Sequence, residues 1–174
     1  MDNQKLRIAY HESGHAVMAL ICRQEIEIVS LRGIGKYPGY MKLVGGVATD
    51  AVSEIKICLA GGVGESVFLD NSIKIAIDDL NRAAANIVNL LNNSYQFRKW
   101  AEGLDDPGPD MLSDVEEPLV RACIADCING CVERMRQLKP LTQLIADELM
   151  KKEELTGGEV SALFNSYMAA RDLE

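Results

Sequence analysis

The stretch AYHESGHAV, residues 9–17, places both histidines of the 174-residue chain four positions apart, with a glutamate directly after the first. Residues four apart lie on one face of a helix, so His11 and His15 can reach a single metal ion. Glu12 is turned about 100° away and can take a proton from water that the metal activates. This His-Glu-x-x-His spacing is typical of zinc hydrolases.

The same stretch lies within a run of apolar residues that predicts the central helix of the fold. Residues 3–22 are apolar around most of a helical circumference, which is typical of a buried helix. Two unpaired imidazoles cost free energy when they are buried there, and a bound metal ion removes that cost. The alternative is that both are ordinary helix histidines, satisfied by hydrogen bonds. Gly14, a poor helix former, leaves room for another group to approach.

The rest of the chain predicts helices around one hairpin. Alternating residues predict strands at 25–31 and 40–48, and helical periodicity predicts helices at about 50–69, 72–95, 116–138, 141–153 and 158–169. In the first of these helices, Gly61, Gly62 and Gly64 predict very close packing against another segment, and Thr49 and Ser53 are the candidate caps.

We therefore expect a compact, mostly α-helical fold with one small β-hairpin or sheet after the motif helix. In this interpretation residues 1–174 form a single domain. Residues 1–100 make the half that holds the metal site, and residues 101–118 make an acidic, proline-containing loop whose charges are solvated. Residues 119–174 make the C-terminal helices.

Charge and hydropathy argue against several classes of partner. The chain has 18 Lys and Arg against 26 Asp and Glu, a net charge of −8, which leaves no basic face for nucleic acid. No apolar run approaches the roughly 20 residues that span a bilayer. Polar and charged residues in the first turns are unlike a signal peptide. We expect a cytoplasmic protein with no membrane segment in this chain.

The five cysteines have two interpretations. Cys123, Cys127 and Cys131 recur every four residues, so on a helix they form a stripe that can hold a metal or a redox centre. Their neighbours are apolar, as are those of Cys22 and Cys58. This setting favours small, reduced residues of the core.

A zinc site needs a third protein ligand and an open fourth position. No histidine remains, so the ligand is a carboxylate or a cysteine; the candidates are Glu54, Cys58, Glu65, Asp78 and Asp79. Asp78 and Asp79 have the surroundings most suggestive of a third ligand, because they form an acidic pair early on a predicted helix. Helix geometry alone does not separate these two, and Asp70 also stays open.

Several stretches together resemble the peptidase domain of FtsH-type zinc proteases, an ATP-driven and membrane-anchored family. They are AYHESGHAV with its hairpin, LAGGVGE at 59–65, DDLNRAAANIV at 78–88 and EELTGGEVSALF at 153–164. The resemblance spans nearly the whole chain and implies a helical metallopeptidase domain. It also implies that Asp79 is the third zinc ligand, with Asp78 in reserve, and that Glu65 supports the ligands.

The chain departs from the family pattern at several places. Ser13 replaces the usual alanine, Val63 replaces an arginine, and the stretch before Asp79 is shortened. No Walker A motif of an ATPase is present, because Gly35-Lys36 is followed by Tyr37. The sequence also contains no stretch like the membrane anchor of the family.

The leading interpretation is a zinc-dependent metallopeptidase in which His11, His15 and Asp79 bind Zn²⁺. Glu12 is the catalytic base, which takes a proton from water whose pKa the metal brings to about 7 and passes it to the leaving amine. The resemblance implies that an extended substrate pairs with a strand made of Tyr40, Met41, Lys42, Leu43 and Val44. Without a motor, the expected substrates are peptides or unfolded protein segments.

Two other functions stay open. The first is a non-catalytic binding or assembly module of the same fold; the family forms hexamers, so a homo-oligomer or association with a full-length relative is possible. The second is a zinc hydrolase that acts on a non-peptide amide. Intact His11, Glu12 and His15 favour catalysis over the module.

Overall fold

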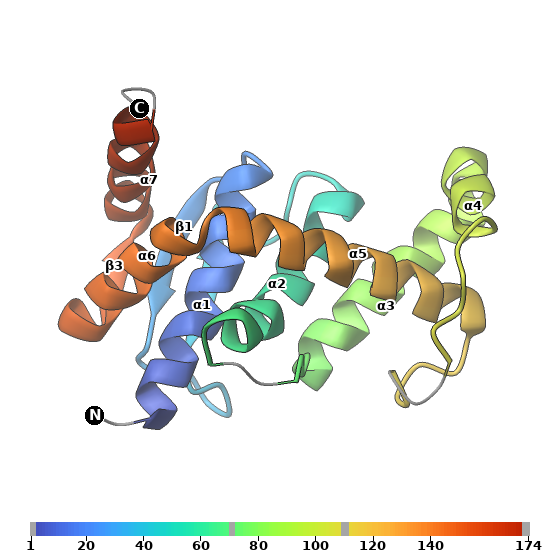
Figure 1. Ribbon diagram of the computed structural model, residues 1–174, viewed down its shortest axis with the longest axis horizontal. Coiled ribbons are helices and arrows are strands. Elements are labelled where there is room, and N and C mark those ends of the chain that lie inside the picture. The colour runs from blue at the N-terminus through green and yellow to red at the C-terminus, as the bar shows by residue number, and fades with distance from the viewer. Residues whose placement is uncertain (1–2, 70–71, 109–111, 172–174) are drawn as a thin grey trace.

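The computed structural model describes residues 3–69, 72–108 and 112–171, which fold mainly into helices (Figure 1). The described helices are α1 (Asn3–Ile21), α2 (Ala51–Leu69), α3 (Ile77–Asn93), α4 (Tyr95–Ala101), α5 (Pro118–Gln137), α6 (Lys139–Lys152) and α7 (Gly157–Arg171). The strands are β1 (Ile26–Ser30), β2 (Tyr40–Leu43) and β3 (Glu154–Thr156), which form an antiparallel sheet in the order β2-β1-β3. The expected fold class, mostly α with a small sheet after the motif helix, is confirmed.

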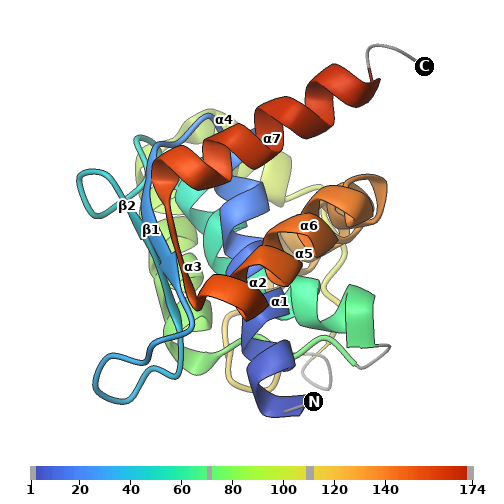
Figure 2. The ribbon, with the colours of Figure 1, turned by 90° about the vertical axis from the view of Figure 1, so that its left-hand side faces the viewer.

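Helix α1 lies in the centre of the molecule. Its residues from Ala9 to Ala19 are nearly all buried, as the apolar circumference predicts. Figure 2 shows the strands on one side of α1 and α2, with α5 and α6 on the other side. Helix α7 projects from the body beside α6 and carries the C-terminal end.

Glycines bring α1 and α2 into backbone contact. A Cβ added at Gly14 would lie 2.4 Å from the carbonyl oxygen of Ala60, and one added at Gly64 would lie 2.6 Å from that of Tyr10. Neither position has room for any side chain. The close packing expected from the glycines of the second helix is therefore confirmed.

Several local features differ from the expectations. Strand β3 pairs with β1 but is only three residues long, too short to show the alternation of a strand. Asp50 caps α2 by accepting from the Ser53 backbone N–H at 2.9 Å, whereas Thr49 and Ser53 were the candidate caps. Thr49 instead binds Gln24. A separate short helix, α4, follows α3 because Ser94 ends α3 and caps α4.

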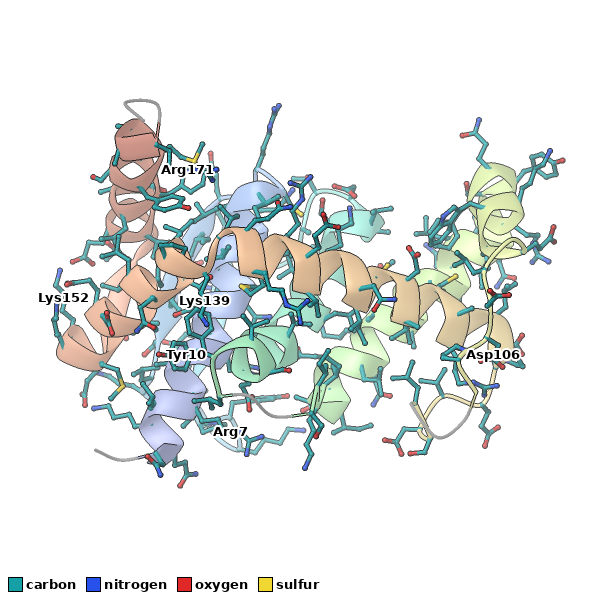
Figure 3. All side chains as sticks on the ribbon, viewed as in Figure 1. Arg7, Tyr10, Asp106, Lys139, Lys152 and Arg171 are labelled. Atoms are coloured by element: carbon teal, nitrogen blue, oxygen red, sulfur yellow. The ribbon has the colours of Figure 1, made fainter. Side chains whose placement is uncertain are left out.

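The acidic segment 101–118 is more tightly attached than its composition predicts. Asp106, at the end of the molecule farthest from α7 in Figure 3, accepts two hydrogen bonds from the buried guanidinium of Arg121. Leu112 and Val115 are buried in the core. The expectation that the charges of this segment are merely solvated is therefore wrong for Asp106.

The five cysteines are free thiols, and those of α5 pack into the core as expected. Burial raises the pKa of Cys127 to about 11 and that of Cys131 to about 12. Among the described residues no cysteine belongs to a group of three or more side chains close enough to share a metal ion. No described helix has the length and hydrophobicity needed to cross a bilayer.

Candidate metal centre

Two elements bring three side chains that could hold a metal ion to one point. His11 and His15 lie one turn apart on α1, and Asp79 lies in the first turn of α3. The Nε2 atoms of the two histidines are 3.0 Å apart, and each is 3.5 Å from Oδ2 of Asp79. Within the described ranges this is the group of His, Cys, Asp and Glu side chains that is close enough to hold an ion.

The spacing of these three atoms fits zinc. Bonds of about 2.0–2.1 Å in a tetrahedral arrangement separate neighbouring ligand atoms by about 3.3–3.4 Å. The observed separations of 3.0, 3.5 and 3.5 Å bracket that value. Two imidazoles and one carboxylate also form a donor set that zinc sites commonly use, with the fourth position left open.

Helix α2 contributes no ligand atom, yet it fixes the orientation of both imidazoles. Nδ1 of His15 donates to the carbonyl oxygen of Ile57 at 2.7 Å, and Nδ1 of His11 lies 2.8 Å from Oε1 of Glu65. In the neutral form of each ring these acceptors hold the proton on Nδ1, so the lone pair is then on Nε2. Glu65 in turn binds Arg7, which Figure 3 labels near the N-terminal end of α1.

Gly61 of α2 provides the space in which the imidazoles meet. A Cβ at this position would lie 2.4 Å from Nε2 of His15 and 2.7 Å from Nε2 of His11. Any side chain here would occupy the place where the lone pairs converge. The glycines of this helix therefore serve two purposes, since Gly64 admits the α1 backbone and Gly61 admits the two rings.

The charges of the cluster favour a cation. Burial lowers the pKa of His11, but hydrogen bonds to the carboxylates of Asp79 and Glu65 outweigh burial and raise it to about 10. Burial raises the pKa of Asp79, but its hydrogen bonds to both histidines hold that pKa well below its usual range. The site thus stabilises positive charge between the rings and the carboxylate.

Glu12 occupies the position that the motif predicts for a base. Its side chain is 5% exposed, and burial raises the pKa of its carboxyl group. Its carboxylate makes no hydrogen bond with another described residue, and Glu12 lines the same cavity as His11, His15 and Asp79. Gly39 makes room for it, because a Cβ there would lie 3.0 Å from Oε1 of Glu12.

The cavity has a volume of about 610 Å³ and extends from the cluster of His11, His15 and Asp79 to the sheet. Tyr40, Met41, Lys42 and Leu43 of β2 all line it. Strand β2 is at the edge of the described sheet, since only β1 pairs with it. Val44 lies just beyond the strand, and its backbone N–H is donated to the carbonyl of Glu25.

The structure separates the other candidate ligands from the cluster. Asp78 points to Lys36, with Oδ2 and Nζ 2.7 Å apart, and Glu54 binds Arg82. Cys58 lines the cavity but is not part of the metal-binding group. Asp70 lies outside the described residues. The part played by the Ile57 carbonyl has no signal in the sequence, because every residue carries that group.

No protein-family model matches the chain, but curated proteins do. The chain is 27% identical over 173 residues to ATP-dependent zinc metalloprotease FtsH 3 of Phytoplasma mali, a match that covers 92% of this chain and 28% of that protein. It is 25% identical over 191 residues to ATP-dependent zinc metalloprotease FtsH of Streptobacillus moniliformis, covering 96% and 27%. The ATP-dependent zinc metalloprotease YME1 homolog of Schistosoma mansoni is 23% identical over 184 residues, covering 97% and 28%.

These matches extend over nearly the whole of this chain, while the chain spans about 28% of the length of the first of these relatives. They confirm the resemblance to FtsH-type zinc metalloproteases that the motifs predict, and they support an FtsH-type peptidase domain.

Proposed function

We propose that this chain, as an FtsH-type peptidase domain, is a zinc-dependent peptidase that cleaves peptides or unfolded protein segments. The observation that carries the proposal is the convergence of His11, His15 and Asp79 at zinc-like spacing. The buried carboxylate of Glu12 lines the same cavity. The names of the relatives, all zinc metalloproteases, support the same activity.

Glu12 is the proposed general base. A zinc ion held by the two histidines and Asp79 would supply a Lewis acid that polarises the peptide carbonyl and acidifies water. Because burial raises the pKa of Glu12, its carboxylate is a stronger base than an exposed glutamate. It takes the proton of the attacking water and then delivers it to the leaving amine nitrogen.

The edge of β2 is the proposed binding site for the substrate backbone. An extended peptide can add to an unpaired strand edge through main-chain hydrogen bonds, which select for unfolded chain rather than for sequence. Tyr40 to Leu43 line the cavity beside Glu12, so a peptide paired there would pass the base. This arrangement supports cleavage within extended segments.

The test compares wild type with Glu12→Gln in hydrolysis of an unfolded, fluorescently labelled protein after zinc loading. We expect the variant to lose at least about a hundredfold in kcat, the scale of general-base catalysis, and to retain its zinc. Glu133→Gln, which makes the same substitution on the exposed part of α5, is the matched control and should leave the rate unchanged. Equal hydrolysis by wild type and Glu12→Gln would overturn the mechanism.

The same assay addresses the alternative of a non-catalytic module. A wild-type protein that binds zinc but hydrolyses neither peptides nor unfolded protein favours an assembly role. Zinc binding without hydrolysis thus separates the metal site from the proposed activity.

A further inference from the structure

A buried carboxylate on α2 is unexplained by the ligand set and by the proposed mechanism. Glu54 is 6% exposed, and its Oε2 accepts the backbone N–H of Ala48 at 2.8 Å. Its Oε1 accepts from the guanidinium of Arg82 on α3. Burial of a carboxylate is costly unless it is paired and hydrogen-bonded, so this pair must remain intact in the folded protein.

Arg82 follows Asp79 by three residues on α3, so the two side chains share one face of that helix. The Glu54–Arg82 pair therefore attaches α2 to the helical turn that carries the third candidate ligand. Arg82 reaches this position from the surface, since its side chain is 54% exposed.

The start of α3 needs such an attachment. Its N-cap residue, Ala76, offers no side-chain hydrogen bond to the free N–H groups of the first turn. Asp79 lies in that turn, and its Oδ2 must stay 3.5 Å from both histidine Nε2 atoms. The other ion pair of the turn, Lys36 with Asp78, is largely exposed to solvent and therefore weak.

We propose that Glu54 and Arg82 are positioning residues that hold Asp79 in register with the two histidines; this inference rests on the proposed zinc site. With this pair, one face of α2 orients all three ligands. Glu54 acts on Asp79 through Arg82, the Ile57 carbonyl acts on His15, and Glu65 acts on His11. These α2 residues are spaced by 3 and 8 positions, which keeps them on one side of the helix.

Charge and position predict opposite effects for the loss of Arg82. As a positive charge close to Asp79, Arg82 repels a metal cation, so its removal alone would tighten zinc binding. As a positioning residue, its removal frees the turn of Asp79 and weakens zinc binding. The sign of the change in affinity distinguishes the two roles.

The experiment measures zinc dissociation constants of wild type, Arg82→Gln, Glu54→Gln and the double variant by competition with a chromogenic chelator. We expect Arg82→Gln to weaken zinc binding about tenfold, the lower end for residues that orient metal ligands. The double variant should bind about as weakly as the weaker single variant, because both substitutions break one interaction. Arg32→Gln removes the same charge from a surface site away from the cavity and serves as the control.

The visible absorption spectrum of the cobalt-loaded protein provides a readout besides affinity. A displaced carboxylate changes the ligand geometry, so the bands of Arg82→Gln should shift or weaken while Arg32→Gln keeps the wild-type spectrum. Unchanged or tighter zinc binding by Arg82→Gln, with a wild-type spectrum, would overturn the inference. Failure of the wild type to bind zinc would instead overturn the proposed function on which it rests.

Discussion

Helix α2 borders two cavities of comparable size, about 610 and 420 Å³, whose walls have different chemistry. The first contains the two histidines and the carboxylates of Glu12 and Asp79, all largely buried. The second has apolar walls that include Phe97 and Trp100, with the thiols of Cys127 and Cys131. Its charged residues, such as Lys56 and Arg134, are exposed at the rim.

The difference between the two cavity walls shows that the presence of a cavity alone does not identify a functional site. In the first cavity, buried polar groups converge and each imidazole has a fixed partner on α2. In the second cavity, burial only makes the thiols harder to ionise. We therefore propose the first cavity as the site of chemistry, and the following variants test this contrast.

The largest difference between the two cavities is expected when a methyl group is added to each of them. Gly61→Ala places a Cβ within 2.4 Å of Nε2 of His15, whereas Gly130→Ala in the second cavity meets no atom within 4 Å. Gly61→Ala should lower zinc affinity by at least about a hundredfold, as displaced ligand geometry does. Gly130→Ala should bind zinc like wild type and, as a glycine in a helix, gain about 1 kcal/mol of stability. Isothermal titration and thermal unfolding measure both, and equal zinc affinities would remove the distinction between the cavities.

The thiols of the second cavity should be protected rather than reactive. The pKa of Cys127 rises from 9.0 to about 11 because of burial, so its thiolate fraction at pH 8 falls about a hundredfold. Alkylation of the native protein by iodoacetamide, followed by mass spectrometry, should be slower than in urea by at least that factor. The raised pKa also implies a sign for stability: the contribution of this thiol is complete below pH 9 and is lost as pH rises through about 11. Rapid alkylation of native Cys127 at pH 8 contradicts an inert second cavity.

An intermediate effect on zinc affinity is expected when a hydrogen bond from α2 to a candidate ligand is weakened. Glu65→Gln keeps the shape of the side chain but weakens its hydrogen bond to His11, so zinc affinity should fall about tenfold to a hundredfold. Asp126→Asn, the corresponding change in the second cavity, should leave zinc affinity unchanged. Chelator competition measures both constants, and a similar loss in the two variants points to net charge rather than orientation.

The smallest effect concerns an unpaired hydroxyl on α1. Oγ of Ser13 is fully buried and has no hydrogen-bond partner among the described residues. Replacement by alanine removes the unpaired group and favours the helix, so Ser13→Ala should stabilise the fold by about 1 kcal/mol. Zinc affinity should not change, because the hydroxyl takes no part in the cluster. A destabilised Ser13→Ala protein, in denaturant titration, indicates that the hydroxyl is satisfied in solution.

The sequence predicts those parts of the site that depend on helical spacing. His11, Glu12 and His15 are fixed relative to one another by a single helix. The glycines of α2 predict its close packing against another segment, which the structure shows to be α1. Asp79 lies on another helix, so spacing could not separate it from Asp78, and the family resemblance was needed. The structure then shows the two carboxylates facing different partners.

Other features have no pattern that the sequence reveals. The Ile57 carbonyl that orients His15 is a backbone group, and the Glu54–Arg82 pair joins residues 28 positions apart. Strand β3 is defined by its pairing with β1 rather than by alternation. These contacts arise only when distant segments meet in the fold.

The most direct test of the metal site is elemental analysis of zinc per chain after reconstitution and gel filtration. It compares wild type with His15→Ala, Asp79→Ala and the matched control Asp78→Ala. The three-ligand site predicts about one zinc per chain in wild type and Asp78→Ala, and almost none in His15→Ala and Asp79→Ala. Wild type without zinc, or Asp79→Ala with as much zinc as Asp78→Ala, would contradict it.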